Sequence, residues 1–260
     1  MNRLPDAAFL HRLADAADEV TLSHYRKRLD VEAKVKPGYR FDPVTAADRD
    51  AERVIRSIIE AEFPEHAVLG EEFGEAGSGP TKWVIDPVDG TRPFICGIPV
   101  WGTLIGLTIE GRAHMGLMSQ PFTGERFWAT ETETWARGPL GLGRLRSRET
   151  EDLSHAILHT NSPERYPDFP EIGFAGIQQA VQMTRFGGEC YAFAMLAAGQ
   201  IDLCLEPSLQ PYDIVALIPI IERAGGVVSD LGGNRAENGG AILASANARI
   251  HEAALRVLNS

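Results

Sequence analysis

Apolar positions in the first part of the chain follow the spacing of amphipathic helices. Between residues 7 and 30 they recur every three or four positions with charged residues between them, which predicts a helix with one buried face. A second helix is predicted at 46–61, because apolar positions share a face there and Pro64 stops the run. The stretch between these helices, 31–45, contains prolines and a glycine and is predicted to be extended or loop.

The middle of the chain alternates short apolar runs with turn residues, the pattern of β-strands. A loop rich in glycine and proline is expected at 74–80, and a turn at 110–112 joins two of the runs. This arrangement predicts an antiparallel meander. The expected strands are 66–70, 83–86, 100–109, 113–119 and 125–130.

After residue 155 the predicted strands alternate with helices, which indicates a layered α/β sheet. The charged, leucine-poor stretch 146–152 divides the two patterns. We therefore expect an N-terminal α+β half, 1–148, and a C-terminal α/β half, 149–260, in one compact unit. The strands expected in the second half are 156–160, 182–185, 201–205, 226–229 and 241–244, and the helices are 171–180, 189–198, 213–223 and 247–258.

Composition narrows the class of protein. The chain has 260 residues, of which 44% are hydrophobic and 23% are charged, as in ordinary globular proteins. The net charge of −11 disfavours a nucleic-acid surface, which needs a basic face. No apolar run approaches the roughly 18 residues of a membrane span. Charged residues interrupt the N-terminal segment, so no secretory signal peptide is expected there. The three cysteines fit a reducing compartment. We expect a cytoplasmic protein with a small-molecule partner and neither nucleic acid nor membrane.

The segment 86–91 carries the strongest chemical signal. An apolar strand delivers Asp86 to its end, Pro87 is expected to force a sharp exit, and Asp89 follows three residues later. Two carboxylates and a backbone carbonyl, such as that of Val88, are hard oxygen ligands that suit Mg²⁺. The alternative interpretation is an ordinary turn in which the aspartates cap the backbone.

The end of the same segment suits a phosphate group. Gly90 allows close backbone approach, and Thr91 could begin a short helix whose free N–H groups bind an oxyanion.

Three further acidic positions have ordinary structural explanations when each is considered alone. Glu71 would be a solvated charge, Asp213 the N-cap of a helix, and Asp48 part of a loop that enters a helix.

Taken together, these segments resemble the inositol monophosphatase family of metal-dependent phosphatases over nearly the whole chain. The resemblance implies the family's sugar-phosphatase-like fold, an alternating α-β-α-β-α sandwich, and its usual homodimer. Tyr212 stands where the family often has tryptophan, and little effect on the metal is expected. The matching segments are DPVTAAD (42–48), GEE (70–72), WVIDPVDGT (83–91) and YDIVALIPIIERAGG (212–226).

The resemblance assigns roles to these residues. It implies two Mg²⁺ ions, with a third near Glu71 left open, and a water molecule that attacks phosphorus in line. Glu71 and Thr91 would orient that water, with Asp48 holding the Thr91 hydroxyl. The implied metal ligands are Glu71, Asp86 and the Val88 carbonyl for one ion and Asp86, Asp89 and Asp213 for the other. The implied phosphate and substrate contacts at this end are Val88, Asp89, Gly90, Thr91 and Asp213.

Three further segments resemble the histidinol-phosphatase branch: GTRPFI (90–95), GTLI (102–105) and QP with ERFW (120–128). Arg92 replaces a lysine of that branch. The expected substrate is therefore L-histidinol phosphate. Esters of inositol, 3′-phosphoadenosine 5′-phosphate and fructose bisphosphate are the alternatives within the family, and a non-catalytic acidic metal-binding module is the alternative of another class.

Substrate choice is expected to depend on charged residues outside the metal motifs. Glu206 lies seven residues before Asp213, which is the spacing of a substrate-binding glutamate in the family. Arg185 resembles a substrate-contacting arginine of the histidinol-phosphatase branch, and Glu189 opens a predicted helix. The carboxylates would receive the cationic amine and imidazole of the substrate. A surface salt bridge is the alternative for each.

Overall fold

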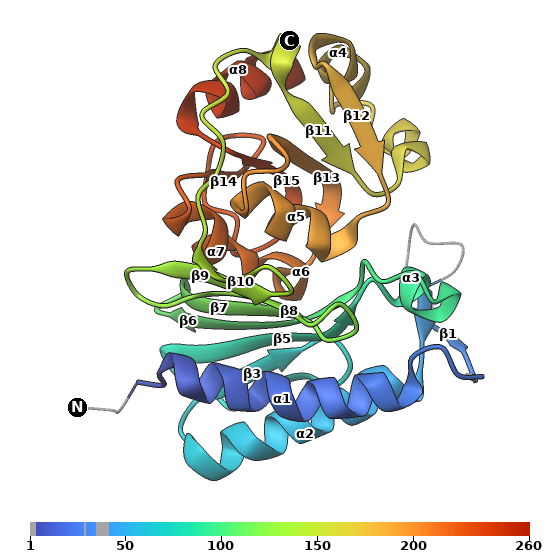
Figure 1. Ribbon diagram of the computed structural model, residues 1–260, viewed down its shortest axis with the longest axis vertical. Helices are drawn as coiled ribbons and strands as arrows, with labels where there is room; N and C mark the ends of the chain where they lie inside the picture. The colour runs from blue at the N-terminus through green and yellow to red at the C-terminus, as the bar shows by residue number, and fades with distance from the viewer. Residues whose placement is uncertain (1–3, 29, 35–41) are drawn as a thin grey trace.

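The computed structural model describes residues 4–28, 30–34 and 42–260, which form five layers (Figure 1). Two helices cover one face of a large sheet, and further helices separate that sheet from a smaller one with its own outer helices. This is the expected α-β-α-β-α sandwich. Within the described residues, no helix is long and apolar enough to cross a membrane. Residues 35–41 of the segment 31–45, which the sequence predicts to be extended or loop, lie outside the described residues.

The first layer consists of α1 (Ala7–His24) and α2 (Ala46–Glu62). The prediction that the first helix continues to residue 30 is wrong. The chain leaves the helix at Tyr25, which turns its ring against Phe94 and Trp101 at centroid distances of 5.3 and 5.1 Å. Two short antiparallel strands follow, β1 (Glu32–Lys34) and β2 (Asp42–Val44).

The second layer is an eight-stranded sheet in the order β10-β9-β8-β7-β6-β5-β3-β4. Strands β5 to β10 form an antiparallel meander, which includes the predicted one at β6, β7 and β8, and β3 joins β5 in parallel. The sequence pattern missed β4, β9 and β10; β10 is exposed and alternates glycine with other residues, so it has no buried face to reveal it. The strands are β3 (Ala67–Gly70), β4 (Gly74–Ala76), β5 (Thr81–Asp89), β6 (Gly102–Ile109), β7 (Arg112–Gln120), β8 (Glu125–Ala129), β9 (Thr134–Gly138) and β10 (Gly141–Arg144).

Strand β5 contradicts one expectation, because it does not leave the sheet at Pro87. The strand continues to Asp89, and its register with β6 shifts between Asp86 and Asp89. Such a bulge tolerates a residue that cannot donate a ladder hydrogen bond. Thr103 Oγ1 donates to the Pro87 carbonyl at 2.8 Å and holds the bulge. The short helix α3 (Thr91–Cys96) then begins as predicted.

The C-terminal part of the chain, drawn uppermost in Figure 1, contains a mixed five-stranded sheet in the order β12-β11-β13-β15-β14. A single helix expected at 213–223 is instead divided at residues 215–216, since Pro219 cannot donate the hydrogen bond that Val215 would accept. The strands are β11 (Ile157–Thr160), β12 (Met183–Phe186), β13 (Leu203–Leu209), β14 (Val227–Asp230) and β15 (Gly240–Ser245). The helices are α5 (Glu189–Ala197), α6 (Pro211–Ile214) and α7 (Leu217–Arg223) between the sheets, α4 (Phe174–Ala180) and α8 (Ala248–Leu258) outside, and two 3₁₀ helices, η1 (Leu153–His155) and η2 (Pro163–Asp168).

A buried apolar cluster joins the two sheets through α5 and α7. Leu104 and Met118 of the first sheet belong to the same cluster as Cys204 and Ile242 of the second. The ends of β3, β5 and β13 and the starts of α3, α5 and α6 therefore meet around one cavity. The division between halves at residue 148 stays a prediction.

Candidate active site

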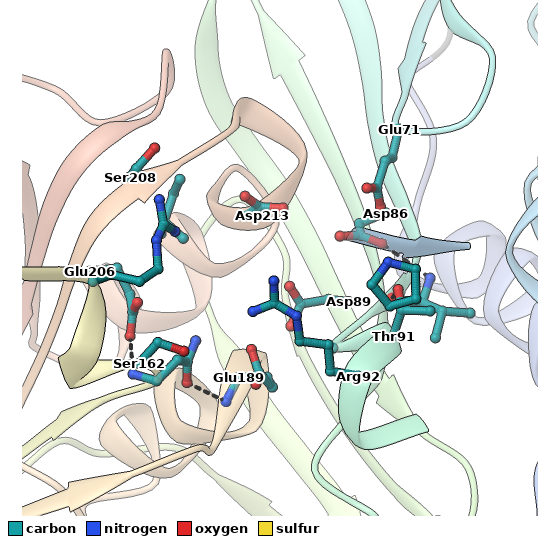
Figure 2. Close-up of a pocket in the computed structure, with 16 residues that line it drawn as sticks. Glu71, Asp86, Asp89, Thr91, Arg92, Ser162, Glu189, Glu206, Ser208 and Asp213 are labelled. Carbon is teal, nitrogen blue, oxygen red and sulfur yellow. Dashed lines mark hydrogen bonds between the residues drawn. The ribbon is translucent and has the colours of Figure 1, made fainter. Parts of the chain in front are cut away.

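One cavity collects most of the residues singled out by sequence (Figure 2). Its walls come from both sheets and from the helices between them. The residues that line it are Pro43, Glu71, Asp86, Val88, Asp89, Gly90, Thr91, Arg92, Asn161, Ser162, Arg165, Glu189, Glu206, Ser208, Leu209 and Asp213. Segments more than a hundred residues apart thus converge at this point.

Three aspartates form the centre of one wall. One carboxylate oxygen from each of Asp86, Asp89 and Asp213 lies within 4.8 Å of the other two. Backbone N–H groups fix each side chain: Val88 donates to Asp86 at 3.1 Å, and both Cys190 and Gln210 donate at 2.7 Å, to Asp89 and Asp213. Glu71, at the end of β3, points toward Asp86 in Figure 2.

The electrostatics of this wall indicate what it can bind. Burial and then the charges of Glu71, Asp89 and Asp213 raise the pKa of Asp86 well above its usual range. Burial and then Glu189 raise the pKa of Asp89 to about 7, although the Cys190 N–H opposes this. Crowded carboxylates of this kind are stabilised by a divalent cation, and their hard oxygens fit Mg²⁺. The donor set therefore fits the metal that the sequence implied.

The predicted contact between Asp48 and Thr91 is present. Thr91 Oγ1 lies 3.2 Å from Asp48 Oδ1 and 3.2 Å from the Val88 carbonyl oxygen. The other Asp48 oxygen accepts from the backbone N–H and the hydroxyl of Thr45, at 2.9 and 2.6 Å, as part of the capping box of α2. The cap thereby fixes the carboxylate that meets the Thr91 hydroxyl.

Gly90 is required by two features of the site. Its φ of +82° lies in the left-handed region, which glycine adopts without strain. A Cβ at this position would also lie 2.9 Å from the Glu189 Cγ atom. The backbone can therefore turn into α3 directly beside the cavity, as the phosphate-binding prediction requires.

The opposite wall carries two more carboxylates. Glu206 on β13 is buried and accepts from the Asn161 backbone N–H at 2.7 Å; burial raises the pKa of Glu206 well above its ordinary value. Burial also raises the pKa of Glu189 to about 7, against the opposing charge of Arg92. The Asn161 side chain accepts from the Glu189 N–H at 2.7 Å, so one asparagine holds both positions.

The remaining predicted residue, Arg185, is not among the residues that line the cavity. It lies exposed on β12, opposite His159 of β11, and its role in substrate binding stays a prediction. Two arginines that sequence reasoning did not propose as site residues, Arg92 and Arg165, do line the cavity. Arg165 lies on η2, which follows the end of β11, and no local motif marks it.

Comparisons with known proteins agree with this geometry. The model of the inositol monophosphatase family matches residues 3–260. The Bifunctional phosphatase IMPL2, chloroplastic, of Arabidopsis thaliana is 40% identical; the match spans 88% of this chain and 65% of that protein, less than two thirds of its length. The Histidinol-phosphatase of Streptomyces coelicolor is 38% identical, with 98% of this chain and 97% of that protein covered. A solved inositol monophosphatase from Zymomonas mobilis is 34% identical with a TM-score of 0.85, over 97% of both chains.

These matches confirm the expected resemblance, including that to the histidinol-phosphatase branch. They indicate a phosphoric monoester hydrolase.

Proposed function

This chain belongs to the inositol monophosphatase family, and we propose that it hydrolyses L-histidinol phosphate to L-histidinol and phosphate with the help of two Mg²⁺ ions. The observation that carries the proposal is the division of the cavity into two acidic walls. One wall clusters three aspartates tightly enough for a divalent cation. Glu189 borders that cluster, because its charge raises the pKa of Asp89, and Asn161 links the Glu189 backbone to Glu206 on the other wall. An ester with a phosphate at one end and cationic groups at the other suits both walls.

On the first wall, the carboxylates of Asp86, Asp89 and Asp213 would hold one cation. Glu71, Asp86 and the Val88 carbonyl would hold the other. Bound there, Mg²⁺ lowers the pKa of a water molecule and offsets the negative charge of the phosphate. A third ion near Glu71 is not needed for this chemistry and stays open.

The residues around Thr91 would direct the attack. When the Thr91 hydroxyl donates to Asp48, its oxygen lone pairs are free to accept a hydrogen bond from the attacking water. Glu71 would take a second hydrogen bond from the same water and fix its direction. The backbone at Gly90 and Thr91 would bind the phosphate oxygens, so that water attacks phosphorus in line with the leaving alcohol.

On the second wall, Glu206 and Glu189 would receive the amine and the imidazole of the substrate. A cation is the natural partner for a buried carboxylate, because ion pairing offsets the cost of burying its charge. Relatives named histidinol-phosphatase support this choice of substrate. Arg185 remains a candidate contact by resemblance, and the expected homodimer and cytoplasmic location also stay predictions.

The test is a panel of phosphate esters assayed with Mg²⁺: histidinol phosphate, inositol 1-phosphate, 3′-phosphoadenosine 5′-phosphate and fructose 1,6-bisphosphate. We expect histidinol phosphate to have the highest kcat/KM, and the chain to restore growth of a histidine auxotroph that lacks its own histidinol phosphatase. Preference for a neutral polyol ester with no complementation would contradict the proposed substrate. That result would favour inositol phosphate as the substrate, an alternative supported by the similarity to the inositol monophosphatase from Zymomonas mobilis.

A further inference from the structure

A buried carboxylate lies beneath the turn that carries Glu71. The side chain of Glu52, on α2, is fully buried. Its two oxygens accept from the backbone N–H groups of Glu72 at 2.8 Å and Phe73 at 3.3 Å. Arg56, one helical turn further along α2, donates Nε to the same carboxylate at 2.7 Å.

The turn is fitted closely to this carboxylate. A Cβ at Gly70 would lie only 2.0 Å from a Glu52 oxygen, so the end of β3 rests on the carboxylate with no room for a side chain. Arg56 Nη2 donates to the Gly74 carbonyl at 2.5 Å, on the far side of the turn. Glu52 and Arg56 thus hold residues 70–74 from one end to the other.

Glu71 needs such a support because its neighbour repels it. The Glu71 side chain points toward Asp86 in Figure 2, and both carboxylates line the same cavity, so two like charges lie close together. Without a cation between them, this repulsion favours movement of the Glu71 turn away from Asp86. Two hydrogen bonds to a buried, ion-paired carboxylate resist that movement.

The helix face that carries Glu52 also holds Thr91, the second group that would orient the water. Asp48, Glu52 and Arg56 follow one another at intervals of four residues, so they share one face of α2. Asp48 reaches Thr91, while Glu52 and Arg56 hold the Glu71 turn. One rigid helix therefore sets the separation between the two groups that would orient the water.

We propose that Glu52 is a positioning residue for the metal site, which holds Glu71 at binding distance from Asp86 before the cation arrives. The inference rests on the proposed function only in taking Glu71 as a metal ligand. It does not depend on which phosphate ester is the substrate.

The test compares Glu52→Gln with Glu62→Gln. Glutamine at position 52 has only one oxygen, so its N–H₂ group faces either the Glu72 N–H or the Phe73 N–H and Arg56 Nε. In both orientations two donors face each other and at least one hydrogen bond is lost. Glu62 is a matched control, because it lies on the same helix and pairs with Arg12 at the exposed surface. Mg²⁺ affinity is measured on the substrate-free protein by calorimetry, together with the rise in Tm that Mg²⁺ causes.

We expect Glu52→Gln to weaken Mg²⁺ binding about tenfold or more and to reduce the Mg²⁺-dependent rise in Tm, with Glu62→Gln unchanged in both. A folded Glu52→Gln variant with wild-type Mg²⁺ affinity would overturn the proposal, even if its Tm were lower. If that variant does not fold, Arg56→Lys replaces it; weaker Mg²⁺ binding supports the proposal, and wild-type binding overturns it. Failure of the histidinol phosphate assay would leave the binding result intact, so the two proposals are tested separately.

Discussion

The two walls of the cavity are both acidic, yet they differ in how their carboxylates are arranged. On the first wall three aspartates approach one another within 4.8 Å. On the second, Glu206 and Glu189 are separated by Asn161, which binds the glutamate at 206 through its N–H and the backbone at 189 through its side chain. The first arrangement needs a concentrated positive charge, whereas the second suits single cationic groups.

Under the proposed function, this difference would separate catalysis from substrate choice. Groups on the first wall would act on any phosphate ester, because they address the phosphate and the water. Groups on the second wall would act only on esters that carry a suitable cation. Variants on the two walls should therefore have different kinetic signatures.

The largest effect is expected from Asp86→Asn on the first wall. Asp86 is central to both proposed cation sites, so kcat should fall at least roughly a thousandfold for every ester. Removal of a carboxylate with a raised pKa should also increase the Tm of the metal-free protein, since a repelling charge is lost. Steady-state kinetics and thermal unfolding in EDTA check the two parts. Retained activity with saturating Mg²⁺ would contradict the assignment of the wall.

A selective effect is expected from Glu206→Gln on the second wall. The variant keeps the shape of the side chain and loses the charge that would pair with the substrate cation. We expect kcat/KM for histidinol phosphate to fall about 10- to 100-fold, which corresponds to the loss of one charge-assisted contact. For p-nitrophenyl phosphate, which has no cation, kcat/KM should change less than about threefold. An equal loss of kcat/KM for both esters would show that Glu206 does not act through the cation of the substrate.

The pH dependence of stability gives a third distinction. The folded pKa values of Asp89 and Glu189, about 7, exceed the ordinary carboxyl values near 4. Their contribution to the free energy of unfolding in EDTA is therefore greatest at low pH and is lost as pH rises from about 4 to 7, on the order of a few kcal/mol in total. Urea unfolding of wild type and Glu189→Gln across this range measures the contribution. Parallel pH curves for the two proteins would rule it out.

The smallest effects should distinguish two arginines near the second wall. Arg165 is half-buried and lines the cavity, whereas Arg185 is exposed outside it. We expect Arg165→Ala to lower kcat/KM for histidinol phosphate about tenfold and Arg185→Ala no more than about fivefold, the range of an exposed charge contact. A larger loss for Arg185→Ala would favour the contact implied by family resemblance over the one that the structure suggests.

The same contrast explains what could be predicted from sequence. The first wall is built largely from short contiguous motifs, so Asp86, Asp89 and Thr91 could be proposed as neighbours in one site before the fold was known. The second wall depends on Asn161 and Arg165, which have no motif and reach the cavity only because β11 ends beside β13. Glu52 was also missed, since a buried glutamate on an amphipathic helix has the same sequence pattern as a solvated one. The bulge at Pro87 arises from strand pairing that local patterns do not encode.

The most direct test of the central claim is a crystal structure with Mn²⁺ in place of Mg²⁺ and with inorganic phosphate, using anomalous scattering to locate the metal. We predict anomalous peaks at coordination distance, about 2.1 Å for Mg²⁺ and similar for Mn²⁺, from carboxylate oxygens of Asp86, Asp89 and Asp213, with phosphate against Gly90 and Thr91. Metal bound elsewhere, with these oxygens uncoordinated, would contradict the account.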